Sequence, residues 1–158
     1  MDALAQKLGA RLKGAGAKLV TAESCTGGWA AQVVTSVAGS SAWFECGFVT
    51  YSNQAKRELL GVRDDTLQEY GAVSEETARE MAQGALRRGR GTVALAVTGV
   101  AGPGGGSPTK PVGMVCFAWA SARSVRSETQ QFSGDRESVR RQSVIRALEG
   151  VLQHLDGG

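Results

Sequence analysis

The sequence has one histidine, His154, and this scarcity excludes the commonest machinery of hydrolytic enzymes. A Ser-His-Asp or Cys-His site needs a histidine as general base, and histidine-based zinc hydrolysis needs histidine ligands. His154 lies near the end of the chain in a helical stretch, where we expect a surface residue. A hydroxyl nucleophile in this protein therefore depends on a carboxylate, a lysine or the substrate itself for its activation.

Cysteines and long apolar runs are also few. Cys25, Cys46 and Cys116 are widely spaced and form no CxxC pair, which argues against a disulfide framework and against a metal site. No apolar run approaches the length of a membrane span, and residues 1–7 lack the basic-then-apolar order of a secretory signal. The sequence thus predicts a cytoplasmic protein with no membrane partner and no metal.

Size and charge indicate one globular domain. The chain has 158 residues, of which 42% are hydrophobic and 21% are charged, and we expect a single domain over residues 1–158. The net charge of +3 comes mostly from scattered basic residues, whereas nucleic-acid binders usually gather charge on one face. We expect no nucleic-acid partner, and a few arginines fit one small anionic ligand equally well.

Hydrophobic periodicity predicts helices and strands that intermix along the chain. Helical patterns begin at Asp2, Trp29, Ser52, Ser74 and Asp135, and strand-like runs cover 18–22, 43–51, 92–98, 112–120 and 125–132. The nearly all-apolar run 92–98 is typical of a central strand covered by helices on both faces. A short polar turn separates the last two runs and predicts an antiparallel edge hairpin. We therefore predict a layered α/β/α fold with a mixed, mainly parallel sheet.

Ser24 is the candidate nucleophile. It lies in the segment TAESCTGG at residues 21–28, where a predicted strand passes into a predicted helix. Such a turn exposes a side chain at the sheet edge and surrounds it with free N–H groups of the first helical turn. The N–H groups of Cys25 and Thr26 are the candidates for stabilising an oxyanion. Alternatively, Ser24 or Thr26 is only the helix N-cap, and Cys25 is a competing nucleophile.

Lys56 is the candidate base. Lys7 and Lys13 lie on the predicted first helix in surface-like contexts, whereas Lys56 follows the end of a strand with a buried pattern. Burial lowers the pKa of a lysine and leaves a neutral amine that accepts a proton. The carboxylate of Glu23 either orients a lysine, binds ligand hydroxyls, or simply favours the helix start through the helix dipole.

A glycine-rich and proline-rich stretch follows the predicted central strand. Residues 99–111 hold five glycines and all three prolines of the chain, which predicts a loop with unusual backbone geometry. Glycines such as Gly99 and Gly102 let backbone N–H groups approach a phosphate, although the chain has neither a P-loop lysine nor a GxGxxG fingerprint there. We interpret the loop as an anion cradle at the same sheet edge as Ser24.

Four motifs in a fixed order carry a resemblance to a known family. They are TAESCTGG at 21–28, GFVTYSNQAK at 47–56, GAVS at 71–74 and TGVAGPGG at 98–105. With these motifs, over about residues 5–155, the chain closely resembles the CinA C-terminal domain family of nicotinamide mononucleotide deamidases, PncC-type amidohydrolases. The resemblance implies hydrolysis of the carboxamide of nicotinamide mononucleotide to nicotinic acid mononucleotide and ammonia, in pyridine nucleotide recycling and without a cofactor.

The same resemblance implies roles for individual residues. The family's Ser/Lys pair falls on Ser24 and Lys56, and Arg140 is brought toward the nucleotide phosphate, which a guanidinium suits. Arg136 and Arg141 are alternatives that spacing does not separate. The residues expected to bind substrate are Glu23, Tyr51, Thr98, Gly99, Gly102 and Arg140.

The sequence also predicts an oligomer and leaves two alternative functions open. The edge hairpin and family habit imply a homodimer or a larger homo-oligomer. A non-catalytic nucleotide-binding or competence-associated regulatory module would hold a phosphorylated ligand with the 99–106 loop and Arg140, and Ser24 would be a helix cap. A nucleic-acid accessory would bind DNA with a steep dependence on salt.

Overall fold

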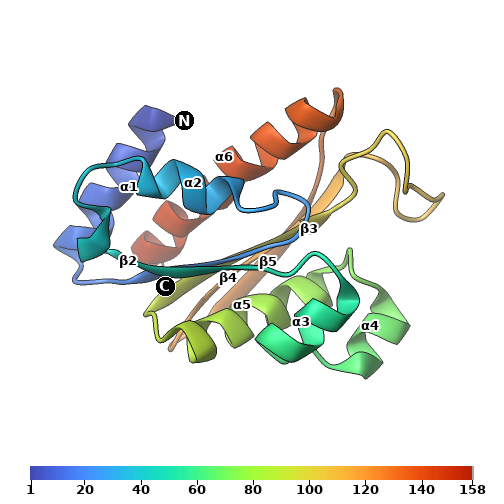
Figure 1. The fold of residues 1–158 in the computed structure, drawn as a ribbon, viewed down its shortest axis with the longest axis horizontal. Coiled ribbons are helices and arrows are strands. Elements are labelled where there is room, and N and C mark those ends of the chain that lie inside the picture. The colour runs from blue at the N-terminus through green and yellow to red at the C-terminus, as the bar shows by residue number, and fades with distance from the viewer. Residues whose placement is uncertain (158) are drawn as a thin grey trace.

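The computed structural model describes residues 1–157, and its helices and strands intermix along the chain (Figure 1). The strands are β1 (Leu19–Glu23), β2 (Phe44–Val49), β3 (Val93–Gly99), β4 (Met114–Ser121) and β5 (Val125–Gln131). The α-helices are α1 (Asp2–Gly14), α2 (Trp29–Thr35), α3 (Asn53–Leu60), α4 (Asp64–Tyr70), α5 (Glu75–Gly89) and α6 (Arg136–Gly157), and Ser40–Ala42 form a short 3₁₀ helix.

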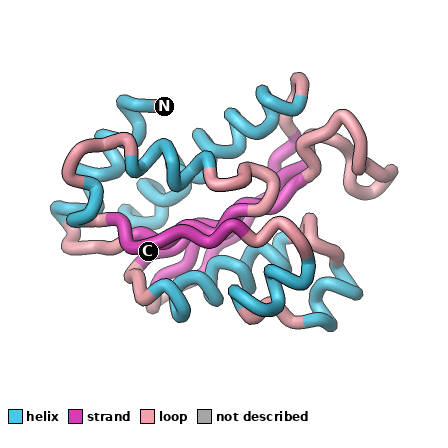
Figure 2. The backbone as a smooth tube through the Cα atoms, viewed as in Figure 1, coloured by secondary structure: helices cyan, strands magenta, loops and turns pink. Residues whose placement is uncertain are grey.

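The strands lie together in one sheet between the helices (Figure 2), and their order is β2-β1-β3-β4-β5. β1 pairs in parallel with β2 and β3, whereas the β3–β4 and β4–β5 pairs are antiparallel. Four strands consequently run in one direction and β4 alone opposes them, which confirms the predicted mixed, mainly parallel sheet with an edge hairpin. Because β1, β2 and β3 are parallel, their carboxyl ends meet at one edge of the sheet, where α/β proteins commonly bind ligands.

Helices cover both faces of the sheet, as predicted. α1, α2 and α6 pack on one face and α3, α4 and α5 on the other (Figure 1). The core under α1, α2 and α6 contains large side chains such as Leu8, Phe117 and Leu148, whereas the core under α5 is rich in alanine. α3 lies so close to α5 that a Cβ added at Gly84 would meet the Leu60 carbonyl oxygen at 1.8 Å. This close packing fixes the helix that carries Lys56.

Most elements begin and end near the residues that the sequence predicts. The Ser52 and Ser74 hydroxyls accept N–H groups of α3 and α5 at 3.0 and 3.1 Å, and Asp135 accepts the Ser138 N–H at 2.9 Å. The first helix begins at Asp2, as its pattern predicts, although Asp2 makes no capping bond. α4 was missed, because seven residues with little apolar content give no clear helical period.

His154 is buried, which corrects the expectation of a surface residue. Its side chain is 4% exposed, and its Nε2 lies 3.2 Å from the Ser121 hydroxyl. His154 follows the buried Val151 by three positions, so both lie on the face of α6 that covers the sheet. Burial lowers the pKa of His154 from its ordinary value. Because α6 is long, His154 lies about 27 Å along the helix from Arg136.

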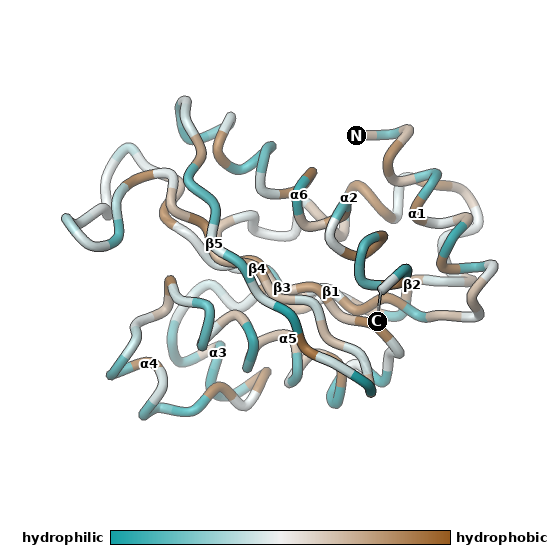
Figure 3. Tube along the Cα trace, turned by 180° about the vertical axis from the view of Figure 1, so that it is seen from behind, coloured by the Kyte–Doolittle hydropathy of each residue, from teal (hydrophilic) through white to brown (hydrophobic). Residues whose placement is uncertain are grey.

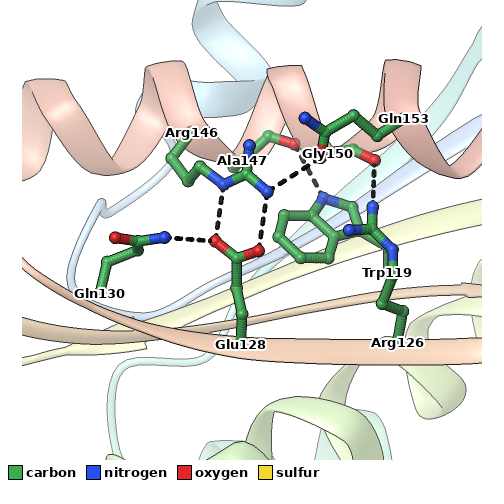
Figure 4. Close-up of polar contacts among 8 residues, drawn as sticks. All are labelled: Trp119, Arg126, Glu128, Gln130, Arg146, Ala147, Gly150 and Gln153. Atoms are coloured by element: carbon green, nitrogen blue, oxygen red, sulfur yellow. Dashed lines mark hydrogen bonds and ion pairs between the residues drawn. The ribbon is translucent and has the colours of Figure 1, made fainter.

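β5 is a polar edge strand (Figure 3) that one ion pair and several hydrogen bonds join to α6 (Figure 4). Glu128 accepts hydrogen bonds from Nε and Nη2 of Arg146 at 2.6 and 2.7 Å, and this bonding holds the pKa of Glu128 below its ordinary value. The buried Trp119 donates from Nε1 to the Ala147 carbonyl at 2.9 Å, and the Arg126 guanidinium lies over its ring. These contacts anchor α6 on the sheet.

Residues 1–157 contain neither a candidate membrane span nor a cluster of potential metal ligands. None of the helices in this range combines the length and the apolar composition that a bilayer crossing requires. The same range contains no group of three or more histidine, cysteine, aspartate or glutamate side chains placed to hold a metal ion.

Candidate active site

Ser24 directly follows β1, at the edge where the parallel strands end. Its N–H donates to the Val97 carbonyl of β3 at 3.0 Å, and the residue is 8% exposed. The chain then turns before α2 begins, with Gly27 and Gly28 at φ +61° and +102°. Two successive residues with positive φ favour glycine, so the paired glycines of the TAESCTGG segment are required by the geometry of the turn.

Lys56 reaches Ser24 from the first turn of α3. It is 1% exposed, and its Nζ lies 3.0 Å from Ser24 Oγ, 2.8 Å from the Thr50 carbonyl oxygen and 3.2 Å from the Tyr51 carbonyl oxygen. The amine and the hydroxyl are therefore within direct hydrogen-bonding reach, which is the geometry that general-base activation of a serine needs.

The surroundings of Lys56 raise the fraction of its neutral form above that of a free lysine. Burial is the main cause that lowers the pKa of Lys56 from 10.5 to about 8. A neutral amine has two N–H groups and one lone pair. If the Thr50 and Tyr51 carbonyls take the two N–H groups, the lone pair faces Ser24 Oγ, so that the hydroxyl can donate its proton to the amine.

Ser24 and Lys56 line a cavity of about 200 Å³. The Thr98 hydroxyl donates to the Ala72 carbonyl at 2.8 Å, which leaves its oxygen free to accept from a ligand. Tyr51 is 63% exposed at the mouth, and its hydroxyl accepts from Arg136 Nη2 at 3.3 Å. The other lining residues are Cys25, Ala72, Val73, Gly99, Ala101 and Arg136.

Glu23 lies inside the protein, which corrects the expectation that it binds substrate. It is fully buried, and its Oε1 accepts from the Thr26 hydroxyl at 2.6 Å and from the Ala30 N–H at 2.9 Å. Its Oε2 accepts from the Ala31 N–H at 3.0 Å. Both oxygens thus hold the start of α2, and the interpretation of Glu23 as a carboxylate at a helix N-terminus is the one that the structure supports.

Cys25 shares the turn with Ser24 but lacks the properties of a nucleophile. It is 6% exposed, and burial is the main cause that raises the pKa of its thiol to about 12. A thiol with such a pKa carries almost no thiolate at neutral pH. Within residues 1–157, the N–H groups of Cys25 and Thr26 donate to no other residue. The two N–H groups predicted to face an oxyanion are thus unengaged.

The three candidate arginines at the start of α6 have different surroundings. Arg136 lines the Ser24 cavity and donates from Nη1 to the Gly102 carbonyl at 2.9 Å. Arg140 donates from Nε to the Cys25 carbonyl and from Nη2 to the Thr26 carbonyl, both at 3.1 Å. Arg141 is paired with Glu137 at 3.0 Å and does not line the Ser24 cavity.

A second, larger cavity of about 730 Å³ adjoins the first at Arg136, which lines both. It extends over the glycines of the turn and the start of α6. Its lining consists of Thr26, Gly27, Gly28, Trp29, Gln32, Arg136, Glu137 and Arg140. A ligand too large for the Ser24 cavity would continue past Arg136 into this space.

Only the base of the glycine-rich loop reaches the site. Gly99 and Ala101 line the Ser24 cavity, whereas Gly102 lies beside it and presents its carbonyl oxygen to Arg136. Residues 103–109 are exposed and project beyond the sheet (Figure 1). The expectation of an anion cradle along the whole loop is thereby corrected, because the exposed tip lies away from Ser24.

Sequence reasoning missed the parts of the site that act through the backbone. The carbonyls of Thr50 and Tyr51 hold Lys56, and the Ala72 carbonyl holds Thr98. Every residue has a carbonyl, so side-chain identity carries no signal for these contacts. The spacing of Arg136 and Arg140 is a signal that was available, since residues four apart share a helix face and Arg141 is turned about 100° away.

Comparison with known proteins gives consistent matches. A family model described as the CinA C-terminal domain matches residues 1–155. The chain is 54% identical to the nicotinamide-nucleotide amidohydrolase PncC of Escherichia coli K12 over 151 residues, which are 95% of this chain and 92% of that protein. It is also 54% identical to the protein of that name from Pseudomonas putida, over 95% of this chain and 94% of that protein.

A solved structure matches over nearly the whole chain. The competence/damage inducible protein CihA of Agrobacterium tumefaciens superposes with a TM-score of 0.94 at 46% identity, covering 98% of this chain and 94% of that chain. The arrangement of the elements therefore agrees with that structure over nearly the whole chain.

Proposed function

This chain belongs to the CinA C-terminal domain family, and from that premise we propose that it is a nicotinamide-nucleotide amidohydrolase. The proposed reaction converts the carboxamide of nicotinamide mononucleotide to the carboxylate of nicotinic acid mononucleotide and releases ammonia, as a step of pyridine nucleotide recycling. The names of the PncC relatives support an amidohydrolase with a nucleotide substrate.

The observation that carries the mechanism is the 3.0 Å contact between Lys56 Nζ and Ser24 Oγ in a buried site. Neutral Lys56 accepts the Ser24 proton while Ser24 Oγ bonds to the amide carbon. The tetrahedral intermediate then expels its nitrogen, which takes the proton from Lys56 and leaves as ammonia. This leaves the acyl group joined to Ser24 Oγ as an ester. Lys56 next takes a proton from water, whose oxygen attacks the carbonyl carbon of that ester. The Oγ–carbon bond breaks, and Ser24 recovers its proton from Lys56.

The remaining cavity residues bind and orient the substrate in this proposal. The N–H groups of Cys25 and Thr26 donate to the oxyanion, because they are unengaged and lie next to Ser24. The Thr98 oxygen accepts an N–H of the carboxamide, and Gly99 leaves room for the ring beside Thr98. Tyr51 covers the mouth of the cavity. No metal or organic cofactor takes part in these steps.

Arg136 is the proposed phosphate ligand among the three arginines. It lines both cavities, and its present partners, the Gly102 carbonyl and the Tyr51 hydroxyl, are neutral. A phosphate therefore meets a guanidinium that no carboxylate neutralises, and charge-assisted bonds of this kind are about twice as strong as neutral ones. A cavity of about 200 Å³ suits the ring and its carboxamide, so the phosphate extends toward the larger cavity.

Assembly, location and domain organisation stay predictions. We propose that residues 1–158 act as one amidohydrolase domain in the cytoplasm and that copies of the chain form a homodimer or a larger homo-oligomer without nucleic acid. Light scattering on the purified protein tests the assembly, and a salt series of DNA-binding measurements tests the expected absence of nucleic-acid binding.

Incubation of the purified protein with nicotinamide mononucleotide and a metal chelator tests the proposed function. We expect stoichiometric ammonia and nicotinic acid mononucleotide, with no loss of rate from the chelator. Calorimetry on the same sample measures binding independently of turnover. Tight binding without release of ammonia would favour the non-catalytic module, and neither binding nor ammonia would reject the nucleotide as a ligand.

A further inference from the structure

Arg140 contacts the backbone of the turn that carries Ser24. Its guanidinium spans two successive carbonyls, those of Cys25 and Thr26, and its carbon lies 5.3 Å from the centroid of the Trp29 ring. The Nε/Nη2 edge is one of the two edges with which a guanidinium grips a phosphate or a carboxylate in bidentate fashion. That edge is occupied by the protein itself.

The peptide unit between Cys25 and Thr26 connects Arg140 to the proposed oxyanion site. Its carbonyl accepts from Arg140, and its N–H, which belongs to Thr26, donates to no other residue within the described part of the chain. This peptide bond is trans, so its C=O and N–H point in opposite directions within one plane. A group that fixes the carbonyl therefore fixes the direction of the N–H.

We propose that Arg140 is a positioning residue: it orients and polarises the Cys25–Thr26 peptide so that the Thr26 N–H donates to the oxyanion formed at Ser24. α6, which carries Arg140, and α3, which carries Lys56, lie on opposite faces of the sheet (Figure 1). Drawing the Cys25 carbonyl toward α6 turns the Thr26 N–H away from α6. This inference rests on the proposed function.

The neighbouring peptide shows what Arg140 adds. The N–H of Cys25 belongs to the peptide whose carbonyl is that of Ser24, and this carbonyl accepts the Gly27 N–H at 3.0 Å within the turn. The turn thus orients the first donor without help, whereas the second carbonyl, that of Cys25, has Arg140 as its partner. A cationic partner on the carbonyl also strengthens the N–H of the same peptide as a donor.

Glu23 holds the same turn through a different group of Thr26. Its buried carboxylate accepts the Thr26 hydroxyl at 2.6 Å, while Arg140 holds the Thr26 carbonyl at 3.1 Å. Thr26 is thereby restrained through its side chain and its carbonyl, and its N–H is left for a ligand. Preorganised donors of this kind cost no rearrangement at the moment of reaction.

Kinetics of Arg140→Met and Arg140→Lys on two substrates test the proposal. The substrates are nicotinamide mononucleotide and nicotinamide riboside, which lacks the phosphate. A positioning role lowers kcat of Arg140→Met by a similar factor on both substrates, at least ~10-fold and up to the ~10²–10³-fold that loss of one oxyanion donor costs. KM changes little. Arg140→Lys regains part of kcat, because its ammonium still donates to one carbonyl.

Arg141→Met is the matched control, since Arg141 lies on the same helix and near the same Trp29 ring but contacts Glu137. We expect wild-type kinetics from this control. Calorimetric binding of nicotinic acid mononucleotide shows whether each variant keeps a folded site. If Arg140→Met fails to fold, the comparison of Arg140→Lys with wild type on the two substrates decides.

Three outcomes would overturn the proposal. A rise in KM confined to the mononucleotide, with unchanged kcat, would make Arg140 a phosphate ligand. Unchanged kinetics in both Arg140 variants would remove it from the reaction. Absence of ammonia release by the wild-type protein would overturn the proposed function, and this inference with it. In the first two outcomes the wild-type protein still releases ammonia, so the proposed function stands.

Discussion

Raising the pH is expected to increase the rate through deprotonation of Lys56. Burial lowers the pKa of Lys56 from 10.5 to about 8, and the mechanism uses the neutral amine. With a pKa near 8, the neutral fraction is ~1% at pH 6, ~10% at pH 7 and ~90% at pH 9. A lysine with the ordinary value would be ~300-fold less deprotonated at pH 7.

The assay is the pH dependence of kcat/KM for ammonia release from nicotinamide mononucleotide. Because kcat/KM reports ionisations of the free enzyme, we expect it to rise about tenfold per pH unit below pH 7 and to level off above pH 9. The substrate phosphate titrates near pH 6, below the step assigned to Lys56. Nicotinamide riboside, which has no phosphate, separates the two ionisations.

Lys56→Arg is the matched control for this profile. Its guanidinium keeps the positive charge but stays protonated across the whole range, so we expect no turnover at any pH. Three results would exclude Lys56 as the base: a wild-type profile that is flat from pH 6 to 9, a midpoint above pH 10, or an active Lys56→Arg variant.

Three further predictions concern stability and binding. The pKa of Lys56 is lower in the folded protein than in the unfolded chain, so the unfolded chain binds more protons and stability rises with pH between about 8 and 10.5. In urea unfolding, the wild type should therefore gain about 2 kcal/mol over Lys56→Met from pH 7 to pH 10. A difference between the two proteins that stays constant with pH would contradict this. Arg136→Met should raise KM for the mononucleotide about 10- to 100-fold, from the loss of a charge-assisted bond, with no change for the riboside in parallel assays. Glu23→Gln should lower the free energy of unfolding by about 1–3 kcal/mol, because either amide orientation turns an NH₂ toward a helix N–H; an unchanged denaturation midpoint would argue against the cap.

The sequence predicted the fold and the closeness of Ser24 to Lys56 for identifiable reasons. The strands have clear apolar or β-branched patterns, and the ends of parallel strands meet at one edge, so residues that follow β1 and β2 are expected to lie near each other. The scarcity of histidine then left few bases for Ser24. The 3.0 Å contact between Lys56 Nζ and Ser24 Oγ agrees with the expectation that these two side chains lie close together.

Side-chain direction was the part that the sequence did not determine. Glu23 and Arg140 stand in motifs that suggested contact with substrate, yet both turn to the backbone around Ser24. Their orientation depends on how α2 and α6 pack over the turn, which is a tertiary property. His154 was misplaced for the same reason, since the face of α6 that is buried follows from its packing on the sheet.

Ammonia release by Ser24→Ala, with Cys25→Ala as the matched control, tests whether Ser24 is the nucleophile. The two variants alter adjacent residues of one turn, and the thermal midpoint and nucleotide binding show whether each is folded. With Ser24 as the nucleophile, we expect that Ser24→Ala binds nicotinamide mononucleotide but releases no ammonia above background, while Cys25→Ala keeps most of the wild-type rate. Full turnover by a folded Ser24→Ala variant would contradict the account.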